Sequence, residues 1–245
     1  MGSGETYFTK DAAMQLNKAI LIYESSEGAF ATVHGIVTAK DGSTSLKAGE
    51  AITHGALASM VLALGKSVQI GQFLPENILS VGLNSLVWWV PQSSQRTWFK
   101  CHNNELIGEE SAITPQPALV FGINEGNWMV FAVKGNKRPT PDTPLFIPPH
   151  FNVWNSGKIC VGTVSVPKDY SASTTEAWNK AFFGSAYSHP NIHGKGQHVS
   201  YKGGSYRLWR DLLDGKFKKF PEKVLLPKNR TVADFIQAVS QGGSL

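Results

Sequence analysis

Four strand-like segments follow one another between residues 79 and 135, and they constrain the fold more than any other feature of the chain. They read LSVGLNSLVWWV, QRTWFKC, PALVFGIN and WMVFAVKG. The last two flank Asn124-Glu-Gly126-Asn, a sequence that predicts the turn of a β-hairpin. Successive antiparallel strands joined by short connections predict a β-meander.

A proline-rich segment, RPTPDTPLFIPPHF, follows the last of these strands. It has five prolines between residues 139 and 149. Proline lacks the amide hydrogen that helices and central strands need, so the segment is predicted to be extended, stiff and on the surface.

Helical patterns and a second hairpin lie on either side of the predicted meander. Residues 19–37 read as a β-hairpin, and residues 50–66 have apolar positions near helical spacing. Further helices are predicted in STTEAWNKAFFGSAY, where Ser173 and Glu176 have capping-box spacing, in SYRLWRDLLDGKF, and in TVADFIQAVSQ with Thr231 as N-cap. The fold class is therefore α+β.

We expect three parts along the chain. Residues 1–75 form a small N-terminal unit of hairpin plus helix, residues 76–194 form the antiparallel meander with its flanking helices, and residues 195–245 form a basic helical extension. From Lys195 to Arg230 there are ten Lys or Arg and three Asp or Glu, a net charge of +7 against +5 for the whole chain. Such a segment fits a solvated surface, an acidic protein partner or nucleic acid, and the sequence leaves nucleic-acid binding open.

Several classes of protein are disfavoured by what the sequence lacks. The two cysteines do not make a disulfide framework in 245 residues, and no Cys-x-x-Cys pair points to a metal. No GxxxxGK[ST] or GxGxxG loop is present, so no cofactor is expected. No apolar run reaches the length of a membrane span and the N-terminus lacks a secretion signal. We expect a soluble cytoplasmic protein without a membrane partner.

One of the two cysteines ends the stretch HFNVWNSGKIC, directly after the proline-rich segment. Irregular backbone on a scaffold is a common setting for reacting groups. Asn152 and Asn155 could each donate to an oxyanion, and Lys158 could favour the thiolate of Cys160. The residues alone leave a second interpretation open, in which Cys160 is a small buried hydrophobic residue. Cys101, in WFKCHNN, has no motif around it and is expected to be structural.

The spacing of this stretch resembles the active-site sequence of ubiquitin-conjugating enzymes, in which His-Pro-Asn precedes the thioester cysteine. His150 stands ten residues before Cys160, Asn152 eight, Gly157 three and Ile159 one. Phe151 replaces the proline, which removes the turn constraint that a proline would impose. The likeness covers about residues 78–190 and implies a UBC-like fold. The whole chain is also similar to the PRTRC protein B family, family D of the prokaryotic ubiquitin-conjugating-like proteins, through FFGSAYSHPN, LWRDLLDGKFKKFP and TVADFIQ.

The resemblance implies a transferase that holds a ubiquitin-like modifier as a thioester on Cys160 and passes it to an amine. It implies oxyanion support from Asn152 and a structural hydrogen bond from His150. The implied partners are a ThiF-like activating enzyme and a small β-grasp modifier, with a JAB-type peptidase as a further candidate.

A second phrase, SHPNIHGKG, follows the predicted helix after the cysteine. One interpretation is a helix-ending loop stopped by Pro190. The other is that His189 returns to the cysteine loop as a base for the incoming amine, with His193 and His198 as weaker candidates. Two other functions stay open as well: a cysteine hydrolase with a Cys160/His189 dyad, and a non-catalytic scaffold.

Overall fold

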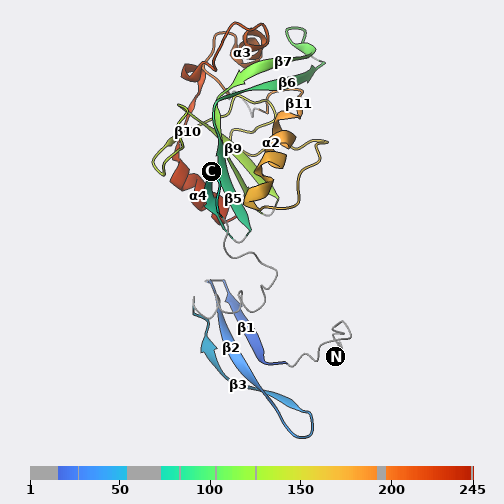
Figure 1. Cartoon of the computed structure of the whole chain (residues 1–245), viewed down its shortest axis with the longest axis vertical. Coiled ribbons are helices and arrows are strands. Elements are labelled where there is room, and N and C mark those ends of the chain that lie inside the picture. Colours follow the sequence, from blue (N-terminus) through green and yellow to red (C-terminus); the bar gives the residue numbers. More distant parts are fainter. Residues whose placement is uncertain are drawn as a thin grey trace. The chain divides into compact units, whose positions relative to one another are not determined.

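The structure, a computed structural model, describes residues 16–26, 28–53, 73–82, 84–102, 104–124, 126–191, 197–243 and 245. The chain divides into two compact units, residues 1–72 and 73–245 (Figure 1). The expected boundaries at residues 75 and 194 stay predictions.

The first unit is a three-stranded antiparallel sheet in the order β1-β2-β3. Its strands are β1 (Lys18–Ser25), β2 (Gly28–Thr38) and β3 (Thr44–Ala51). Pairing of Ser25 with Gly28 closes the first hairpin, so the hairpin predicted over residues 19–37 is confirmed. β3 was not predicted, because its sequence TSLKAGEA has no apolar alternation and its side chains are all exposed. The helix predicted over residues 50–66 is wrong at its start, because Glu50 and Ala51 belong to β3, and most of it lies outside the described residues.

The second unit contains two sheets and three described α-helices. The six-stranded sheet has the order β12-β10-β9-β8-β5-β4, and a three-stranded sheet has the order β11-β6-β7. The strands are β4 (Ile78–Val81), β5 (Ser85–Val90), β6 (Ser93–Cys101), β7 (Gly108–Gln116), β8 (Ala118–Asn124), β9 (Asn127–Val133), β10 (Pro144–Phe146), β11 (Ala186–Tyr187) and β12 (Pro227–Thr231). The helices are η1 (Ala172–Thr174), α2 (Thr175–Phe183), α3 (Gly204–Leu213), η2 (Glu222–Val224) and α4 (Val232–Ser240).

A long two-stranded ribbon runs through both sheets. One arm is β5 followed by β6, and the other is β7 followed by β8. The register is the same in both sheets. From Ser85↔Asn124 to Cys101↔Gly108, moving one residue forward along the first arm moves the paired position one residue back along the second. Pro91 and Pro117 stand where the ladder is interrupted, and neither can donate a ladder hydrogen bond. Figure 1 shows β6 and β7 turned away from the direction of β5.

Helices cover the six-stranded sheet on both faces. Alternate residues of β5, β8 and β9 face opposite sides, so Trp88, Phe121 and Trp128 join one core cluster while Trp89, Val120 and Phe131 join the other. α2 packs in the first cluster and α4 in the second, and Figure 1 shows them on opposite sides of β5 and β9. β8 is buried at every position, which explains its continuous apolar sequence.

The predicted hairpin over PALVFGIN and WMVFAVKG is confirmed, with Asn124 paired to Asn127 across its turn. The C-terminal helix is also confirmed. Thr231 is its N-cap, and the Thr231 side chain and Asp234 make a reciprocal capping box.

The predicted capping box of the helix after the cysteine is wrong, because a turn of 3-10 helix precedes α2 and moves its N-cap to Thr174. The Ser173 hydroxyl contacts Ser171 instead, and Glu176 forms an ion pair with Lys180. The helix also ends earlier than predicted, at Phe183, and residues 186–187 form β11. This early end leads the chain back toward the cysteine loop.

Apolar residues between positions 199 and 225 of the basic C-terminal segment belong to the same core cluster as the meander. Leu208, Trp209 and Leu212 of α3 are completely buried there. The indole N–H of Trp209 donates to the carbonyl of Pro149 at 2.8 Å, at the end of the proline-rich segment. The segment that precedes the cysteine loop is therefore held from α3. The prediction that this segment lies on the surface is wrong in part, because Leu145, Pro148 and Pro149 are buried and β10 lies between β12 and β9.

Candidate functional site

The cysteine loop is a small hairpin, residues 153–159, that extends the central sheet. The amide of Ile159 donates to the carbonyl of Trp128 in β9 at 2.9 Å, and the carbonyl of Gly157 accepts a second hydrogen bond from β9. Cys160 follows directly, and its own amide donates to the carbonyl of Asn152 at 2.7 Å. The backbone that carries the thiol is therefore held to the buried strand β9 by two hydrogen bonds.

Gly157 makes the tight approach of this hairpin to the sheet possible. Its φ is +84°, and a Cβ at this position would lie 2.4 Å from Cζ of Phe131. Both the left-handed backbone and the close contact require glycine. The packing against Phe131 and the left-handed backbone therefore explain why a glycine stands three residues before the cysteine.

We expect Gly157→Ala to lower the free energy of unfolding by about 2 kcal/mol or more, as the sum of backbone strain and overpacking. Gly135→Ala is the matched control, because Gly135 has a φ of +83° and open space around its Cα. Urea titration of both variants separates the two contributions, since the control carries the backbone strain alone. Equal losses in the two variants would contradict the role of Phe131.

Cys160 is exposed and opens into a pocket of about 270 Å³. Three elements meet there: the cysteine loop, the chain after Cys160, and the segment after α2. The lining residues are Asn152, Cys160, Val161, Gly162, Thr163, Val164, Ser185, Ala186, Ser188, His189 and Asn191. The main site residues predicted from the sequence are Cys160, Asn152, His150 and His189. The pocket brings together three of them, Cys160, Asn152 and His189.

Asn152 is held in place by a serine that sequence reasoning missed. Its Nδ2 donates to Oγ of Ser185 at 2.9 Å, and that hydroxyl donates to the carbonyl of Phe182 at 2.7 Å. Asn152 Oδ1 is buried and has no hydrogen-bond partner among the described residues. Ser185 therefore fixes the side-chain amide at the wall of the pocket. No sequence pattern could have identified it, because its role depends on where α2 ends.

His150 lies in the core and not in the pocket. It is fully buried, and its Nε2–H donates to Oε1 of Gln116 at 3.0 Å. Gln116 in turn donates to the hydroxyls of Thr97 and Thr114, at 3.0 and 2.8 Å. This chain of hydrogen bonds ties the start of the cysteine loop to β6 and β7.

Phe151, which stands where the resemblance has proline, is a core residue. It is fully buried and contacts the rings of Phe99, Tyr187 and Tyr206 at centroid distances of 5.6, 6.4 and 5.0 Å. Packing of this kind fixes the chain direction that a proline would restrict by its ring.

The phrase SHPN lies against the cysteine loop. The amide of Asn191 donates to the carbonyl of Phe151 at 2.9 Å, and the carbonyl of Asn191 accepts from Nε2 of His198 at 3.2 Å. His189 lines the pocket, and its Nδ1 is 2.9 Å from the hydroxyl of Ser188. His198 is buried away from the pocket lining, and His193 lies outside the described residues.

The other candidates of the sequence lie outside the pocket. Asn155 is held through its backbone carbonyl by Nζ of Lys228, at 3.1 Å, and does not line the pocket. Lys158 is exposed two residues before Cys160. Cys101 is buried, with its thiol 3.5 Å from the carbonyl of Tyr187, and burial raises the pKa of Cys101. In the described parts of the chain, no three His, Cys, Asp or Glu side chains gather closely enough to hold a metal ion.

Burial of His150 makes the stability of the fold depend on pH. Burial, with a smaller contribution from the neighbouring His198, lowers the pKa of His150 to about 3. Burial also lowers the pKa of His198. In the unfolded chain a histidine takes up a proton near pH 6.5. Between about pH 3 and pH 6.5 the unfolded state therefore binds more protons than the folded state. The free energy of unfolding falls as the pH is lowered through this range.

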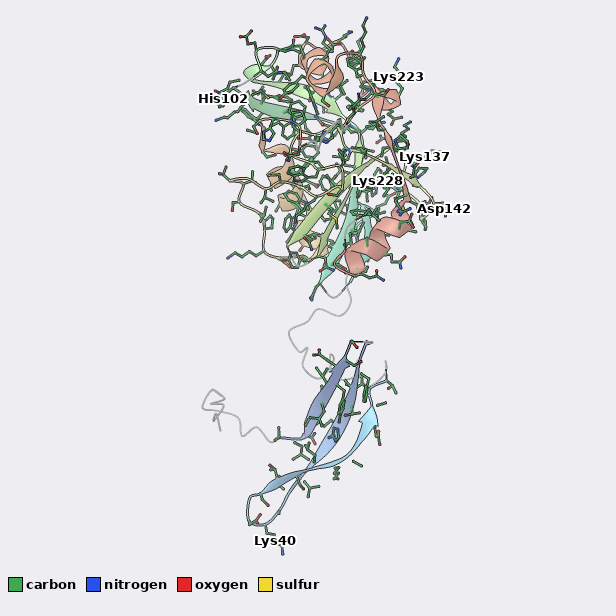
Figure 2. The ribbon with its side chains drawn as sticks, turned by 180° about the vertical axis from the view of Figure 1, so that it is seen from behind. Lys40, His102, Lys137, Asp142, Lys223 and Lys228 are labelled. Carbon is green, nitrogen blue, oxygen red and sulfur yellow. The ribbon has the colours of Figure 1, made fainter. Side chains whose placement is uncertain are left out.

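We expect this loss to begin below about pH 6.5 and to reach at most about 1.4 kcal/mol per pH unit for each buried histidine. Urea titrations at several pH values measure it. His150→Gln should reduce the slope, whereas His102→Gln should not, because His102 is exposed (Figure 2). Identical slopes in the wild type and His150→Gln would exclude His150 as a source.

Comparison with known proteins identifies a family. The model of a family described as prokaryotic E2 family D matches residues 55–228, more than two thirds of the chain. No curated protein and no solved structure matches the sequence. The match includes the cysteine loop, the pocket and α3. No described helix is long and apolar enough to cross a bilayer.

Proposed function

Because the chain belongs to prokaryotic E2 family D, we propose that it carries a ubiquitin-like modifier as a thioester on Cys160 and transfers it to an amine. Membership of the family indicates a ubiquitin-conjugating-like role, and with it an activating enzyme and a ubiquitin-like protein as general partners. One observation carries the proposal: an exposed thiol opens into a pocket whose wall holds the side-chain amide of Asn152.

The reaction has two acyl transfers. The thiolate of Cys160 attacks the carbonyl carbon of the modifier's C-terminal thioester on the activating enzyme, and the enzyme's thiol leaves. An amine then attacks the new thioester, loses a proton, and expels the Cys160 thiol as an amide bond forms. Each step passes through a tetrahedral oxyanion, which a fixed amide donor stabilises. Both steps exchange similar acyl groups, so positioning matters more than a strongly activated thiol.

The partners in this scheme are a ThiF-like activating enzyme and a small β-grasp modifier. A JAB-type peptidase that cuts the product is a further candidate, as in a PRTRC cassette. The cytoplasm is the expected location. In this scheme His189 accepts a proton from the incoming amine, and support comes from its place in the pocket beside Cys160.

The test is to incubate the protein with the activating enzyme, the modifier and ATP. We expect an adduct that thiol reductants cleave, and mass spectrometry should place it on Cys160. No adduct under conditions in which the activating enzyme itself is charged would overturn the proposal.

A hydrolase with a Cys160/His189 dyad is the second candidate, because both residues line one pocket. Within the described part of the chain, however, the His189 ring makes its hydrogen bond with Ser188 and none with Cys160. The hydrolase would cleave a modifier thioester or amide without an activating enzyme and lose this activity in His189→Ala. Conjugation without such cleavage favours the transferase.

A further inference from the structure

A second hollow lies beside the Cys160 pocket, on the outer side of the β6–β7 ribbon. It has a volume of about 480 Å³, and we call it the Trp98 groove. Its lining residues are Trp98, Phe99, Lys100, Glu109, Glu110, Ser111, Gly184 and Ala186. Nothing in the proposed chemistry on Cys160 uses this surface.

Trp98 is the main apolar residue of the groove and is 45% exposed. Trp88 and Trp89, on the preceding strand β5, are buried. Arg96 lies over the Trp98 ring, with its guanidinium carbon 5.7 Å from the centroid. An exposed indole held in a fixed position is typical of residues that bind a partner.

The Trp98 groove adjoins the Cys160 pocket. Ala186 lines both hollows. In the sheet, Ala186 pairs with Trp98 and Trp98 pairs with Ser111, so these three residues form one row across the ribbon. The small side chain of Ala186 lies between the two hollows, and about one strand spacing of 4.8 Å separates its strand β11 from β6.

We propose that the Trp98 groove binds an apolar side chain in the C-terminal tail of the acyl donor, next to the carboxyl group that Cys160 receives. The inference rests on the proposed thioester function and adds a specificity-determining residue to it. An extended peptide advances about 3.3 Å per residue. A chain attached to Cys160 that crosses Ala186 therefore places a residue about two to four positions before its carboxyl terminus on Trp98.

The tail of the donor fits this groove better than the acceptor does. The donor is covalently attached at Cys160, so its last residues must leave the pocket over the neighbouring surface, whereas the acceptor brings only an amine. The charges at the rim also favour an apolar occupant. Lys100 pairs with Glu109 at 3.7 Å, and Glu110 pairs with Arg210. These pairs leave the rim without a strong charge of one sign.

Synthetic peptide thioesters test the proposal without the natural modifier. The probes are N-acetylated alanine hexapeptides that end in glycine thioester, with a single leucine moved from the second to the fifth position before the carboxyl group. Acylation of Cys160 is followed by mass spectrometry at limiting peptide. We expect leucine at one position, two to four residues from the end, to raise the rate about tenfold, the effect of a contact of about 1.4 kcal/mol.

Trp98→Ala should remove this preference. Ile113→Ala is the matched control, because Ile113 lies on the same face of the ribbon and is 64% exposed but does not line the groove. It should keep the preference. Ser111→Lys, which places a charge beside the indole without removing it, should also abolish the preference, and thermal melting shows that each variant is folded.

The outcomes separate this inference from the proposed function. Acylation at one rate for all peptides, or a leucine preference that survives in Trp98→Ala, overturns the role of the groove and leaves thioester formation untouched. No acylation of Cys160 by any peptide overturns both.

Discussion

Cys160→Ser is expected to convert a reductant-sensitive adduct into one that survives reductant, and Cys160→Ala is expected to remove the adduct completely. The serine oxygen forms an oxygen ester, which thiols cleave far more slowly than a thioester. Alanine has no nucleophile. Cys160 is exposed, so neither change opens a cavity, and both variants should unfold at temperatures close to that of the wild type. Gel electrophoresis with and without reductant compares the wild type with the two variants.

Cys101→Ala is the control for this experiment. Cys101 is 1% exposed and lies in the core, with its thiol directed at the carbonyl of Tyr187. The variant should be less stable but should keep the adduct on Cys160. An adduct that persists in Cys160→Ala, or that disappears in a folded Cys101→Ala, would contradict the assignment of the nucleophile.

Asn152→Ala is expected to slow the transfer of the modifier by about 10²–10³-fold, the usual effect of removing one oxyanion donor. The effect should fall on the rate constant of transfer more than on binding, because the donor is needed where negative charge develops. Single-turnover discharge to a small amine measures it. Asn155→Ala is the matched control from the same loop, since Asn155 does not line the pocket, and it should transfer at nearly the wild-type rate.

Ser185→Ala provides a graded version of the same experiment. The substitution leaves the Asn152 amide in the chain but removes the hydroxyl that orients it at 2.9 Å. Its rate should lie between those of the wild type and Asn152→Ala, and Ser185→Thr should restore much of the loss. A rate in Asn152→Ala equal to that of the wild type would exclude oxyanion support by this residue.

Much of the fold could be predicted from local patterns. The hairpin over PALVFGIN and WMVFAVKG and the capped C-terminal helix were read from their residues, because turn and capping preferences act over a few positions. The start and end of α2 were predicted wrongly. Ser173 had an alternative partner in Ser171, and the chain after Gly184 pairs with β6, a contact far away in sequence.

The site was predictable only in part for the same reason. The spacing of the cysteine stretch pointed to Cys160 and Asn152, and the pocket brings them together with His189. The burial of His150 and Phe151 could not be inferred, because it depends on aromatic residues of β6, β11 and α3. Ser185 and Trp98 carry no local signal, since their neighbours in space lie on other elements.

The unbroken register of the long ribbon limits how a chain of this kind can change during evolution. Side chains alternate between the two faces along each arm, so a single inserted residue on one arm would turn Trp98 inward and a core residue such as Phe99 outward. Length changes are tolerated only as matched pairs on both arms or at the tip between Cys101 and Gly108. Homologues with different ribbon lengths should therefore differ at the tip and keep the spacing from Pro91 to Trp98.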